Sequence, residues 1–560
     1  MLRSLTLPVL GAGVLVFSAL PASAASWSTT ATRAFPMSSR VTADLGRAPG
    51  AMPMHVVLGL AAPNHAADRI LVRQATPGDP LYHQYLSPAQ ARAIVSPSGA
   101  RVNAVASYLA RNGFTRISIS RDNMLLSADG TAAIANRAFS TEIHVLASGR
   151  RHIYANAKPA LVPATLRDSV VSVLGLNNYS AHIDLKKKTS VQSCTEVPVL
   201  DVCALSAFGP NDFAQVYDAP ATTGSNTNIA IFAEGDLTQV VADLRTQEQQ
   251  SGLPAVPVNI VMTGPQSGDT SGADEFDLDT QYSTGLAGNV KLLTLYDAPS
   301  LGDADLANAY DQFATDDTSK AASASFGECE LLEDESGGNT TADAIFQEAA
   351  LQGQTVFASS GDDGAACLGV ENGIPAGVPG VEYPASSTYV VGVGGTTLLA
   401  NANGSYYGEI GWYSGGGGQS LVEPAGSWQS GIATLASVGL KGVPDIAMDA
   451  DPDTGANVIV SGAAEEIGGT SLSSPLSLGV WARLETIHGN SLGFAAPILY
   501  KEFSDEGGTA LGLPTGTTRA IGGFHDVELG GNPLPAKPGW DYSTGLGTFD
   551  IGLSGTDILK

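Results

Sequence analysis

From residue 206 to the end of the chain, short apolar runs alternate with segments of helical periodicity, and this alternation restricts the fold more than any other feature. Most of the runs are apolar throughout, as is typical of parallel strands covered by helices on both faces. We predict strands in TNIAIFAEG, VPVNIVMTG, VKLLTLYDA, AASASFG, TVFASSGD and STYVVGVGGT, and helices in LTQVVADLRTQEQQSG, DLANAYDQFATD and TADAIFQEAALQGQ. The sequence therefore predicts an α/β domain over 206–560, with a doubly wound, mostly parallel sheet. Its functional residues are expected at the carboxyl ends of the strands.

The chain before residue 206 has a different organisation. Residues 1–24 contain an apolar run and end in the small-residue pattern ASA, which predicts a secretory signal peptide with cleavage after Ala24. A membrane anchor is the alternative, but the run is short for one. Shorter, mixed strand and helix patterns over 25–180 predict a smaller α+β domain.

Residues 181–205 are predicted to link the two domains. Lys186, Lys187 and Lys188 stand in a row there, and a lysine run without apolar residues is usually a solvated loop. We interpret 181–205 as an exposed linker that proteases can reach, and expect a processing site in it.

Charge divides the chain in the same place. Residues 1–200 hold 19 Lys and Arg against 9 Asp and Glu, whereas the remaining 360 residues hold 9 against 46. The balances of +10 and −37 suggest that the two parts attract each other. A domain this acidic is unsuited to binding nucleic acid, which needs a basic surface. Its carboxylates repel one another at neutral pH and lose their charge in acid, so we expect an acidic working environment.

The stretch GGTSLSSP, residues 468–475, places a serine between glycines and the start of a predicted helix. Backbone N–H groups at a helix N-terminus favour developing negative charge, so Ser471 is a candidate nucleophile whose own N–H serves an oxyanion hole. We place Pro475 in the first turn of this helix and Gly489 at its end. The alternative is that Ser471 only caps the helix.

A serine nucleophile needs a base, and neither histidine after residue 200 is well placed. His488 lies at the far end of the helix that carries Ser471, about 25 Å away at 1.5 Å per residue. His525 follows two glycines and lacks a carboxylate positioned as a triad partner.

Two carboxylates in TSGADEFDLDTQYSTG are better candidates. Ser271 and Asp274 have the spacing of a capping box, so we expect a helix to begin there. Glu275 and Asp279 are then one turn apart on one face, and if both are buried they share a proton. One accepts the serine proton while the other orients it. The alternative is an acidic, solvated helix face.

Further carboxylates follow strands or flank glycine-rich loops. The strand TVFA leads to Asp362 and Asp363, and spacing does not show which of them points inward. A protonated carboxyl group there would donate to an oxyanion, whereas the alternative is a simple Asp-Gly turn. Asp526 and Asp541 flank loops near the C-terminus and offer the hard oxygen ligands that calcium takes, although their spacing is not that of an EF-hand.

Four cysteines suit an exported protein: Cys194, Cys203, Cys329 and Cys367. We pair them in that order, although four cysteines allow three connectivities. No C-x-x-C pair occurs, which argues against a zinc site.

Together these motifs resemble one family, the sedolisins or serine-carboxyl peptidases, which have a subtilisin-like fold and an acid-adapted triad of Ser, Glu and Asp. The similarity of GGTSLSSP to the family's serine motif implies that Ser471 is the nucleophile. The similarity of EFDLD to its E-x-x-x-D helix implies that Glu275 is the base and Asp279 its partner. SSGDDG is similar to its S-G-D strand end, which implies that Asp362, and not Asp363, is the oxyanion-hole acid.

Other segments resemble the same family. DV and GWDYSTGLG are similar to its calcium loop, which implies one structural Ca²⁺ bound by the side chains of Asp526 and Asp541 and the backbone oxygens of Val527, Lys537 and Gly539. SASFGECE is similar to its substrate-pairing strand, which implies substrate contacts from Ser325, Phe326 and Gly327. The front part, with LYHQYLSPAQ, resembles its activation propeptide. The cysteines at 329 and 367 are similar to those of the bacterial branch that pepstatin does not inhibit. Phe326, where many relatives carry Trp or Tyr, and Gly468, often Ser, depart from the pattern.

The resemblance implies a secreted, acid-active endopeptidase made as a self-activating zymogen. We expect a monomer that acts on protein or peptide substrates, has its own propeptide as an intramolecular inhibitor, and uses neither nucleic acid nor, after signal cleavage, a membrane. A tripeptidyl-peptidase of the same family is an alternative. Less favoured are a secreted glycoside hydrolase with two carboxylates, which gives Ser471 no role, and a calcium-stabilised surface protein with an inactive site.

Overall fold

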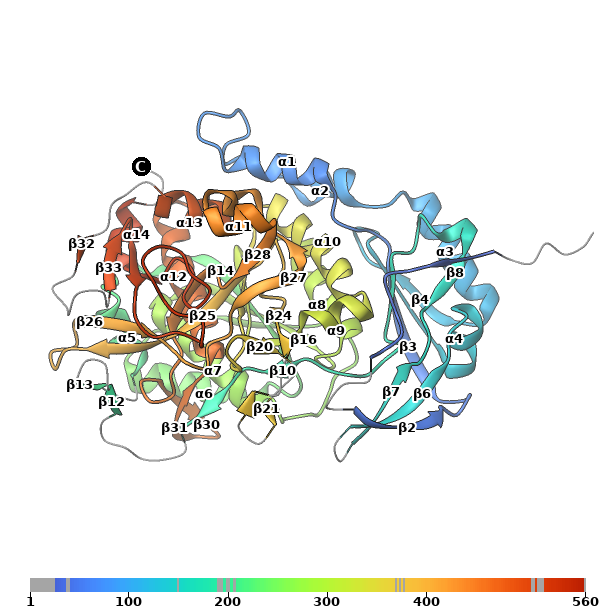
Figure 1. Ribbon diagram of the computed structural model, residues 1–560, viewed down its shortest axis with the longest axis horizontal. Coiled ribbons are helices and arrows are strands. Elements are labelled where there is room, and N and C mark those ends of the chain that lie inside the picture. Colours follow the sequence, from blue (N-terminus) through green and yellow to red (C-terminus); the bar gives the residue numbers. More distant parts are fainter. Residues whose placement is uncertain are drawn as a thin grey trace, which may run out of the picture.

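The computed structural model describes residues 26–36, 41–148, 151–188, 195–197, 202–204, 208–367, 370–371, 374–375, 378–504, 509–510 and 518–557. Its N-terminal part, blue to cyan in Figure 1, lies beside the larger C-terminal part, green to red. The predicted signal peptide, 1–24, lies outside the described residues.

An eight-stranded sheet forms the core of the C-terminal part. Its order is β15 (Val258–Met262), β16 (Val290–Ala298), β14 (Gly224–Glu234), β17 (Ala321–Ala324), β19 (Thr355–Ser359), β25 (Val391–Ala400) and β26 (Tyr406–Gly411), with β29 (Ile446–Asp449) also paired to β25. Every pairing is parallel except that of β25 with β26. The strand order reverses at β14, so the predicted doubly wound, mostly parallel sheet is confirmed.

Two groups of helices accompany this sheet. Helix α12 (Thr470–Ile487) packs across the central strands and against α7 (Ala273–Ala287), which in turn contacts α6 (Thr238–Ser251). Helices α8 (Asp303–Asp316) and α10 (Gly338–Leu351) pack against each other. The other helices are α5 (Pro210–Val216), α9 (Glu330–Ser336), α11 (Ala433–Val438), α13 (Ala495–Ser504) and α14 (Ile551–Asp557). Among the described residues, no helix combines the length and apolar character needed to cross a bilayer.

Short strands of the C-terminal part form small sheets outside the eight-stranded one. They are β18 (Phe326–Cys329), β20 (Ala366–Cys367), β21 (Val370–Glu371), β22 (Ile374–Pro375), β23 (Val378–Pro379), β24 (Glu382–Tyr383), β27 (Gly418–Pro424), β28 (Leu440–Val443), β30 (Ala456–Val460), β31 (Ala463–Gly468), β32 (Thr509–Ala510), β33 (Thr518–Ile521), β34 (Phe524–Val527) and β35 (Thr548–Phe549). The predicted disulfide between Cys329 and Cys367 is confirmed, with 5.2 Å between the Cα atoms. Cys194 lies outside the described residues, so its bond to Cys203 stays a prediction.

The N-terminal part is the predicted α+β unit. One antiparallel sheet has the order β4 (Thr115–Ile119), β5 (Leu125–Thr131), β3 (Pro53–Gly59) and β9 (Ser172–Leu174). A second contains β2 (Val41–Arg47), β6 (Ile143–Ser148) and β7 (Arg151–Asn156), and β1 (Trp27–Thr29) pairs with β8 (Leu161–Pro163). Helices α3 (Gly99–Asn112) and α4 (Ala132–Ala138) enclose a separate core that includes Val56, Val105, Leu109 and Phe139. Helix α3 ends at Gly113 in the left-handed conformation, as its Asn-Gly sequence predicts.

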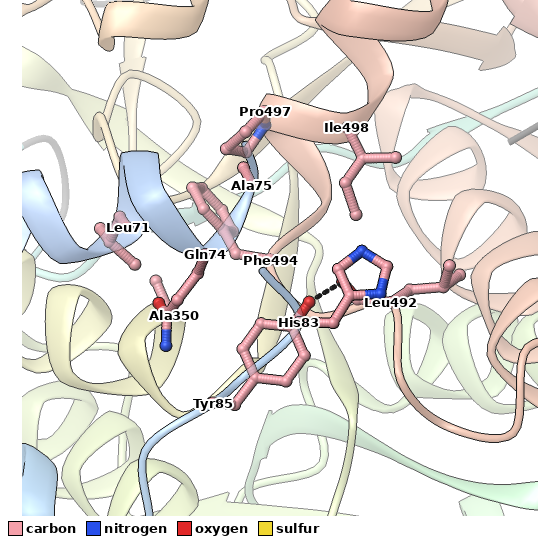
Figure 2. Close-up of a pocket in the computed structure, with 10 residues that line it drawn as sticks. All are labelled: Leu71, Gln74, Ala75, His83, Tyr85, Ala350, Leu492, Phe494, Pro497 and Ile498. Carbon is pink, nitrogen blue, oxygen red and sulfur yellow. Dashed lines mark hydrogen bonds between the residues drawn. The ribbon is translucent and has the colours of Figure 1, made fainter. Parts of the chain in front are cut away.

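Helices α1 (His65–Gln74) and α2 (Pro88–Val95) of the N-terminal part lie over α10 of the C-terminal part (Figure 1). Figure 2 shows the small apolar pocket where the two parts meet, lined by Leu71, Tyr85 and Phe494 among others. The Tyr85 hydroxyl donates to the Leu492 carbonyl, and Gln74 Nε2 donates to the Leu351 carbonyl at 3.0 Å. The two parts therefore share a buried, hydrogen-bonded interface.

Candidate active site

Ser471 is the second residue of helix α12 and is fully buried. The helix follows Gly469, whose φ of 106° is a conformation that residues with a Cβ rarely adopt. A Cβ there would overlap the Asp184 carbonyl and lie 2.7 Å from Asp362 Oδ2. The Ser471 N–H donates to the Asp184 carbonyl oxygen at 3.2 Å. A helix N-terminus thus faces a backbone carbonyl group, which is the arrangement that an oxyanion hole requires.

The position of Pro475 differs from the expectation. It is the sixth residue of α12 and so lies beyond the first turn. Because proline has no N–H, the Ser471 carbonyl lacks its usual helical donor four residues on. The Ser325 hydroxyl lies 3.4 Å from that carbonyl oxygen instead. The proline therefore frees an acceptor that links the helix to the residue before β18.

Glu275 and Asp279 lie one turn apart on α7, and both are almost fully buried. The Ser325 hydroxyl donates to Asp279 Oδ1 at 2.5 Å. Among the described residues, neither Glu275 oxygen has a partner within strict hydrogen-bond geometry, although the nearby Ser471 hydroxyl still lowers its pKa. The same Ser471 hydroxyl donates to the Ser325 carbonyl at 3.3 Å. Ser325 therefore touches both Asp279 and Ser471.

The start of α7 corrects a detail of the sequence interpretation. The helix begins where predicted, but its N-cap is Gly272 and no side chain caps it, so the capping box of Ser271 and Asp274 is wrong. Asp269 accepts the Ser271 N–H, and the Asp274 carboxylate pairs with Lys187. Asp274 therefore forms an ion pair with Lys187 of the linker instead of capping helix α7.

Burial in this acidic environment raises the pKa of the carboxyl pair. The pKa of Glu275 is well above its ordinary value because of burial first, then the adjacent Asp279, with Asp184 and Asp362 adding to the effect. Burial raises the pKa of Asp279 to about 8, against the opposing hydrogen bond from Ser325. Two such close carboxyl groups hold one proton between them over a wide pH range.

Asp362 follows β19 and points toward the start of α12. Its Oδ1 accepts hydrogen bonds from the Thr470 N–H at 2.7 Å and from the Thr470 hydroxyl at 3.0 Å. Burial raises its pKa to about 7, against opposing effects of Lys186 and of the Thr470 hydrogen bonds. The neighbouring Asp363 is only half-buried. Asp362 is therefore the member of the pair that lies beside Ser471.

Residues 181–188, the first part of the linker, are not the solvated loop that the lysines suggested. Residues 182–187 run through the site as two short strands, β10 (His182–Ile183) and β11 (Lys186–Lys187). Strand β10 pairs antiparallel with Phe326 and Gly327, and β11 pairs antiparallel with the end of β31. Lys187 binds Asp274 and Glu465, and Lys188 binds Glu466 at 2.9 Å. Acidic side chains of the C-terminal part thus hold the lysine run in place.

This arrangement brings in residues that the sequence analysis did not single out. Asp184 lies between β10 and β11 and is 1% exposed. His182, Asp184 and Glu382 place one side-chain ligand atom each within 4.8 Å of one another. Thr470 joins Asp362 to the helix start. Thr470 could have been found from the sequence because it precedes Ser471 in the motif. His182, Asp184 and Glu382 are far in sequence from every motif, so no local pattern indicates them.

Neither histidine of the C-terminal part is placed to act as the base of Ser471. His488 follows the last residue of α12, at the opposite end from Ser471. His525 lies on β34, stacks on Tyr406 and pairs through Nε2 with Asp550 at 3.4 Å, which does not make Asp550 a triad partner because His525 has no described contact with Ser471. The partner belongs to the same small sheet region.

The predicted calcium residues lie together near the C-terminus. Asp526 and Asp541 are each 1% exposed, and one loop connects them. In this conformation the Gly539 N–H donates to Asp526 Oδ2 at 3.0 Å and the Lys537 N–H donates to Asp541 Oδ2 at 2.8 Å. Val527 ends β34. Two buried carboxylates are hard oxygen ligands of the kind that calcium takes, and in this conformation the loop N–H groups hold both of them.

Comparisons with known proteins agree with this geometry. Residues 41–179 match the pro-kumamolisin activation domain, and residues 260–492 match the subtilase family. Sedolisin from Pseudomonas sp. (strain 101) is 35% identical over 97% of this chain and 94% of its own length. Xanthomonalisin from Xanthomonas sp. (strain T-22) is 36% identical over 90% of this chain, which spans only 65% of the xanthomonalisin length. Kumamolisin from Bacillus sp. (strain MN-32) is 31% identical over 75% of this chain and 77% of its own length.

A solved structure leads to the same family. Pseudomonas sedolisin, described as a serine-carboxyl proteinase in complex with two molecules of pseudo-iodotyrostatin, superposes with a TM-score of 0.57 at 35% identity. It covers 63% of this chain and 97% of its own. The chain therefore belongs to the sedolisin family of serine-carboxyl peptidases.

Proposed function

We propose that the protein is a secreted, acid-active serine-carboxyl endopeptidase made as a zymogen that processes itself. The observation that carries the proposal is the grouping of Ser471, Glu275, Asp279 and Asp362 around the backbone carbonyl group of Asp184. The predicted signal peptide supports secretion. In this proposal the boundaries are those of the sequence: signal peptide 1–24, propeptide 25–180, linker 181–205 and peptidase domain 206–560.

Ser471 attacks the scissile carbonyl carbon, and Glu275 takes the serine proton and later gives it to the leaving amine. Asp279, held by Ser325, orients Glu275 and tunes its titration. The Ser471 N–H and the protonated carboxyl group of Asp362 stabilise the tetrahedral oxyanion. Carboxyl groups suit acid because an imidazole base would be protonated there and unable to accept the proton.

The pH range follows from the same groups. Asp362 must carry its proton to donate, and its pKa of about 7 means that this proton is lost as the pH rises through neutrality. The Glu275 and Asp279 pair accepts the serine proton in the state with one proton and one negative charge between the two carboxyl groups. Activity is therefore high in acid and falls toward neutral pH.

The test is acid incubation of the purified full-length chain, followed by mass spectrometry and N-terminal sequencing. Self-processing and hydrolysis of a denatured protein support the proposal, and a chain that does neither contradicts it. Internal cleavage products distinguish an endopeptidase from a tripeptidyl-peptidase, which releases three-residue fragments from the N-terminus of its substrate.

Removing both histidines of the peptidase domain should leave activity nearly intact. Because His488 is remote from Ser471 and His525 lies in the small C-terminal sheet, we expect the double variant His488→Gln, His525→Gln to cleave peptides within about tenfold of the unmodified enzyme. The measurement is kcat/KM at acid pH, with the melting temperature as a check on folding. A loss of a thousandfold or more in a folded variant would return histidine to the mechanism.

A calcium ion is part of the proposal as a structural ligand. Asp526 and Asp541 would bind it with their carboxylates, and Val527, Lys537 and Gly539 with their carbonyl oxygens. The ion would neutralise two buried negative charges and fix the loop between β34 and β35. It takes no part in the peptide-bond chemistry.

Calcium should stabilise the folded protein. At about 100 times its Kd we expect an increase in Tm of about 5 °C or more, because the ion binds only the folded state. Asp541→Ala should abolish the increase, whereas Asp453→Ala, on another loop of the same part, should retain it. Thermal unfolding with calcium and with chelator measures both. An unchanged calcium response in Asp541→Ala would place the site elsewhere.

The N-terminal part would act as an intramolecular inhibitor by holding residues 182–187 in the site. Its rim supplies ion pairs that support the predicted attraction, from Arg33 to Asp334 and from Arg121 to Asp316, both at 2.7 Å. These arginines are more than half exposed, so each pair contributes little and is screened by salt. The buried apolar contacts below α1 and α2 contribute the salt-independent part of the interface.

The folded zymogen should be more stable in acid than at neutral pH. Burial raises the pKa of Asp279 and Asp277 to about 8 and that of Asp297 to about 6. Each group keeps its proton in the folded chain after the unfolded chain has lost it, so its stabilising effect is complete below about pH 4 and is lost as the pH rises through 6 to 8. We expect the Tm of Ser471→Ala, which avoids self-digestion, to fall by about 5 °C or more between pH 5 and pH 8. A Tm that rises over this range contradicts the prediction.

A further inference from the structure

The linker presents one particular peptide bond to Ser471. The two residues before Asp184 pair with β18 and its substrate-contacting positions, and the residues after Leu185 pair with β31. Between these pairings the Asp184 carbonyl oxygen accepts the Ser471 N–H at 3.2 Å. An extended segment with its carbonyl group at a helix N-terminus is bound as a substrate would be, with Asp184 on the acyl side.

The Asp184 side chain lies in a polar, almost fully buried pocket. The Ser359 hydroxyl donates to Asp184 Oδ2 at 2.7 Å. On the other side, His182 Nε2 lies 3.4 Å from Asp184 Oδ1 and 3.2 Å from Glu382 Oε1. The pocket thus offers a hydroxyl donor to one carboxylate oxygen, and the linker's own His182 pairs with the other.

Glu382 is fixed at the end of this pocket. It is 2% exposed, and two glycines pack directly on it. A Cβ at Gly327 would lie 2.6 Å from Glu382 Oε2, and one at Gly361 would lie 2.8 Å from its Cδ. Because it has no room to retract, Glu382 limits the length of the side chain that the pocket accepts.

The charged groups around Asp184 come from several elements. They are His182 in the linker, Glu382 in β24, Asp362 after β19 and Glu275 in α7. The only cation among them belongs to the linker itself. In a separate substrate without a histidine two residues before the aspartate, the substrate carboxyl group would face Glu382 with no cation between them.

We infer that the zymogen is cut between Asp184 and Leu185, and that the Ser359 and Glu382 pocket selects a short carboxyl or carboxamide side chain on the acyl side of the cleaved bond. The inference rests on the proposed function and names the bond and the side-chain class. Ser471 Oγ bonds to the Asp184 carbonyl carbon, the C–N bond breaks, and the Leu185 amine leaves with the proton that Glu275 took from Ser471. Water then hydrolyses the ester. The main-chain carbonyl group of Asp184 becomes the C-terminal carboxyl group of the propeptide, and Ser471 regains its proton.

The first test uses the full chain in acid, with the new N-terminus read by mass spectrometry and sequencing. We expect Leu185 as the first new N-terminus. Asp184→Asn should retain cleavage there within about tenfold, since an amide keeps an acceptor for Ser359. Asp184→Leu and Asp184→Lys should lower it by roughly ten- to a hundredfold, because leucine offers Ser359 no acceptor and lysine is longer than the pocket that Glu382 closes. Asp168→Leu, on an exposed site of the N-terminal part, is the matched control.

The second test uses activated enzyme and peptides that differ only on the acyl side of one bond. Asp and Asn should be preferred over Leu and Lys by about tenfold or more. Glu382→Gln should raise the ratio of kcat/KM for the Asp peptide to that for the Asn peptide at pH 6. The glutamine N–H group can donate to an ionised aspartate, whereas the Glu382 carboxylate repels it. Glu335→Gln should leave the ratio unchanged.

The outcomes separate the two proposals. Cleavage that depends on Ser471 but first produces another N-terminus overturns the inferred bond, and a preference for Lys or Leu overturns the inferred pocket. An unprocessed unmodified chain, or processing that persists in Ser471→Ala, overturns the proposed function instead.

Discussion

Replacing Ser471 by alanine should yield a folded protein that stays at full zymogen length in acid and has almost no peptidase activity. We expect kcat/KM to fall by about a millionfold. Losses of this size occur when the nucleophile of a serine protease is removed, because nucleophile and base act together. The hydroxyl donates to the Ser325 carbonyl at 3.3 Å and lies near Glu275, so its loss removes weak buried contacts and little stability. Mass spectrometry of the chain after acid incubation measures processing, and peptide hydrolysis measures the residual rate.

A matched control lies on the same helix. Ser477 is buried like Ser471, but its hydroxyl donates to the Ser473 carbonyl at 2.9 Å within α12. Ser477→Ala should therefore process normally. If Ser471→Ala processed itself at a normal rate in pure form, the nucleophile would have to be another residue. If Ser477→Ala were equally inactive, the effect would be one of helix stability and not of chemistry.

The parts of the fold that could be predicted from the sequence are those with a local signal. The runs that became β14, β16 and β19 are apolar because helices cover the sheet, and burial leaves a pattern in the sequence itself. The grouping of Ser471 with Glu275 and Asp362 was implied by the resemblance of their three motifs to those of the sedolisins, and only the position of Asp362 after a strand also followed from the fold class. Helix boundaries with glycine stops, such as Gly113 and Gly252, were equally readable.

The course of the linker could not be predicted in this way. Lys186, Lys187 and Lys188 have the composition of a solvated loop, and a local pattern contains no information about partners 80 to 280 residues away. Their strand conformation depends on backbone groups of β31 and on carboxylates such as Glu466. For Lys186 and Lys188 the expectation of a solvated loop was wrong because long-range pairing outweighed composition.

The Asp184 pocket was missed for a related reason. Glu382 belongs to a two-residue strand with no motif around it, and its role depends on the register that places His182 opposite Gly327. A shift of one residue would turn the other set of side chains toward the pocket. Likewise, the supposed cap at Ser271 lost its partner Asp274 to Lys187, which no local pattern reveals.

Replacing Asp362 should produce a large loss that depends on whether the new side chain donates a hydrogen bond. Asp362→Ala removes both the oxyanion donor and the acceptor of the Thr470 N–H, and we expect kcat to fall by about 10²- to 10³-fold. Asp362→Asn keeps a donor that needs no protonation, so it should retain more of the rate. Its activity should also extend to higher pH, because the group with a pKa of about 7 no longer titrates.

The measurement is kcat against pH for both variants, with Asp363→Asn as the matched control one residue away. Because Asp363 is half-buried and does not bond Thr470, its substitution should change neither the rate nor the profile. Equal losses in Asp362→Ala and Asp362→Asn, with an unchanged upper pH limit, would mean that Asp362 only positions Thr470. If Asp362→Asn alone retains the rate and works at higher pH, the Asp362 proton is the one donated to the oxyanion. The asparagine amide donates at every pH, so this variant separates donation to the oxyanion from the positioning of Thr470.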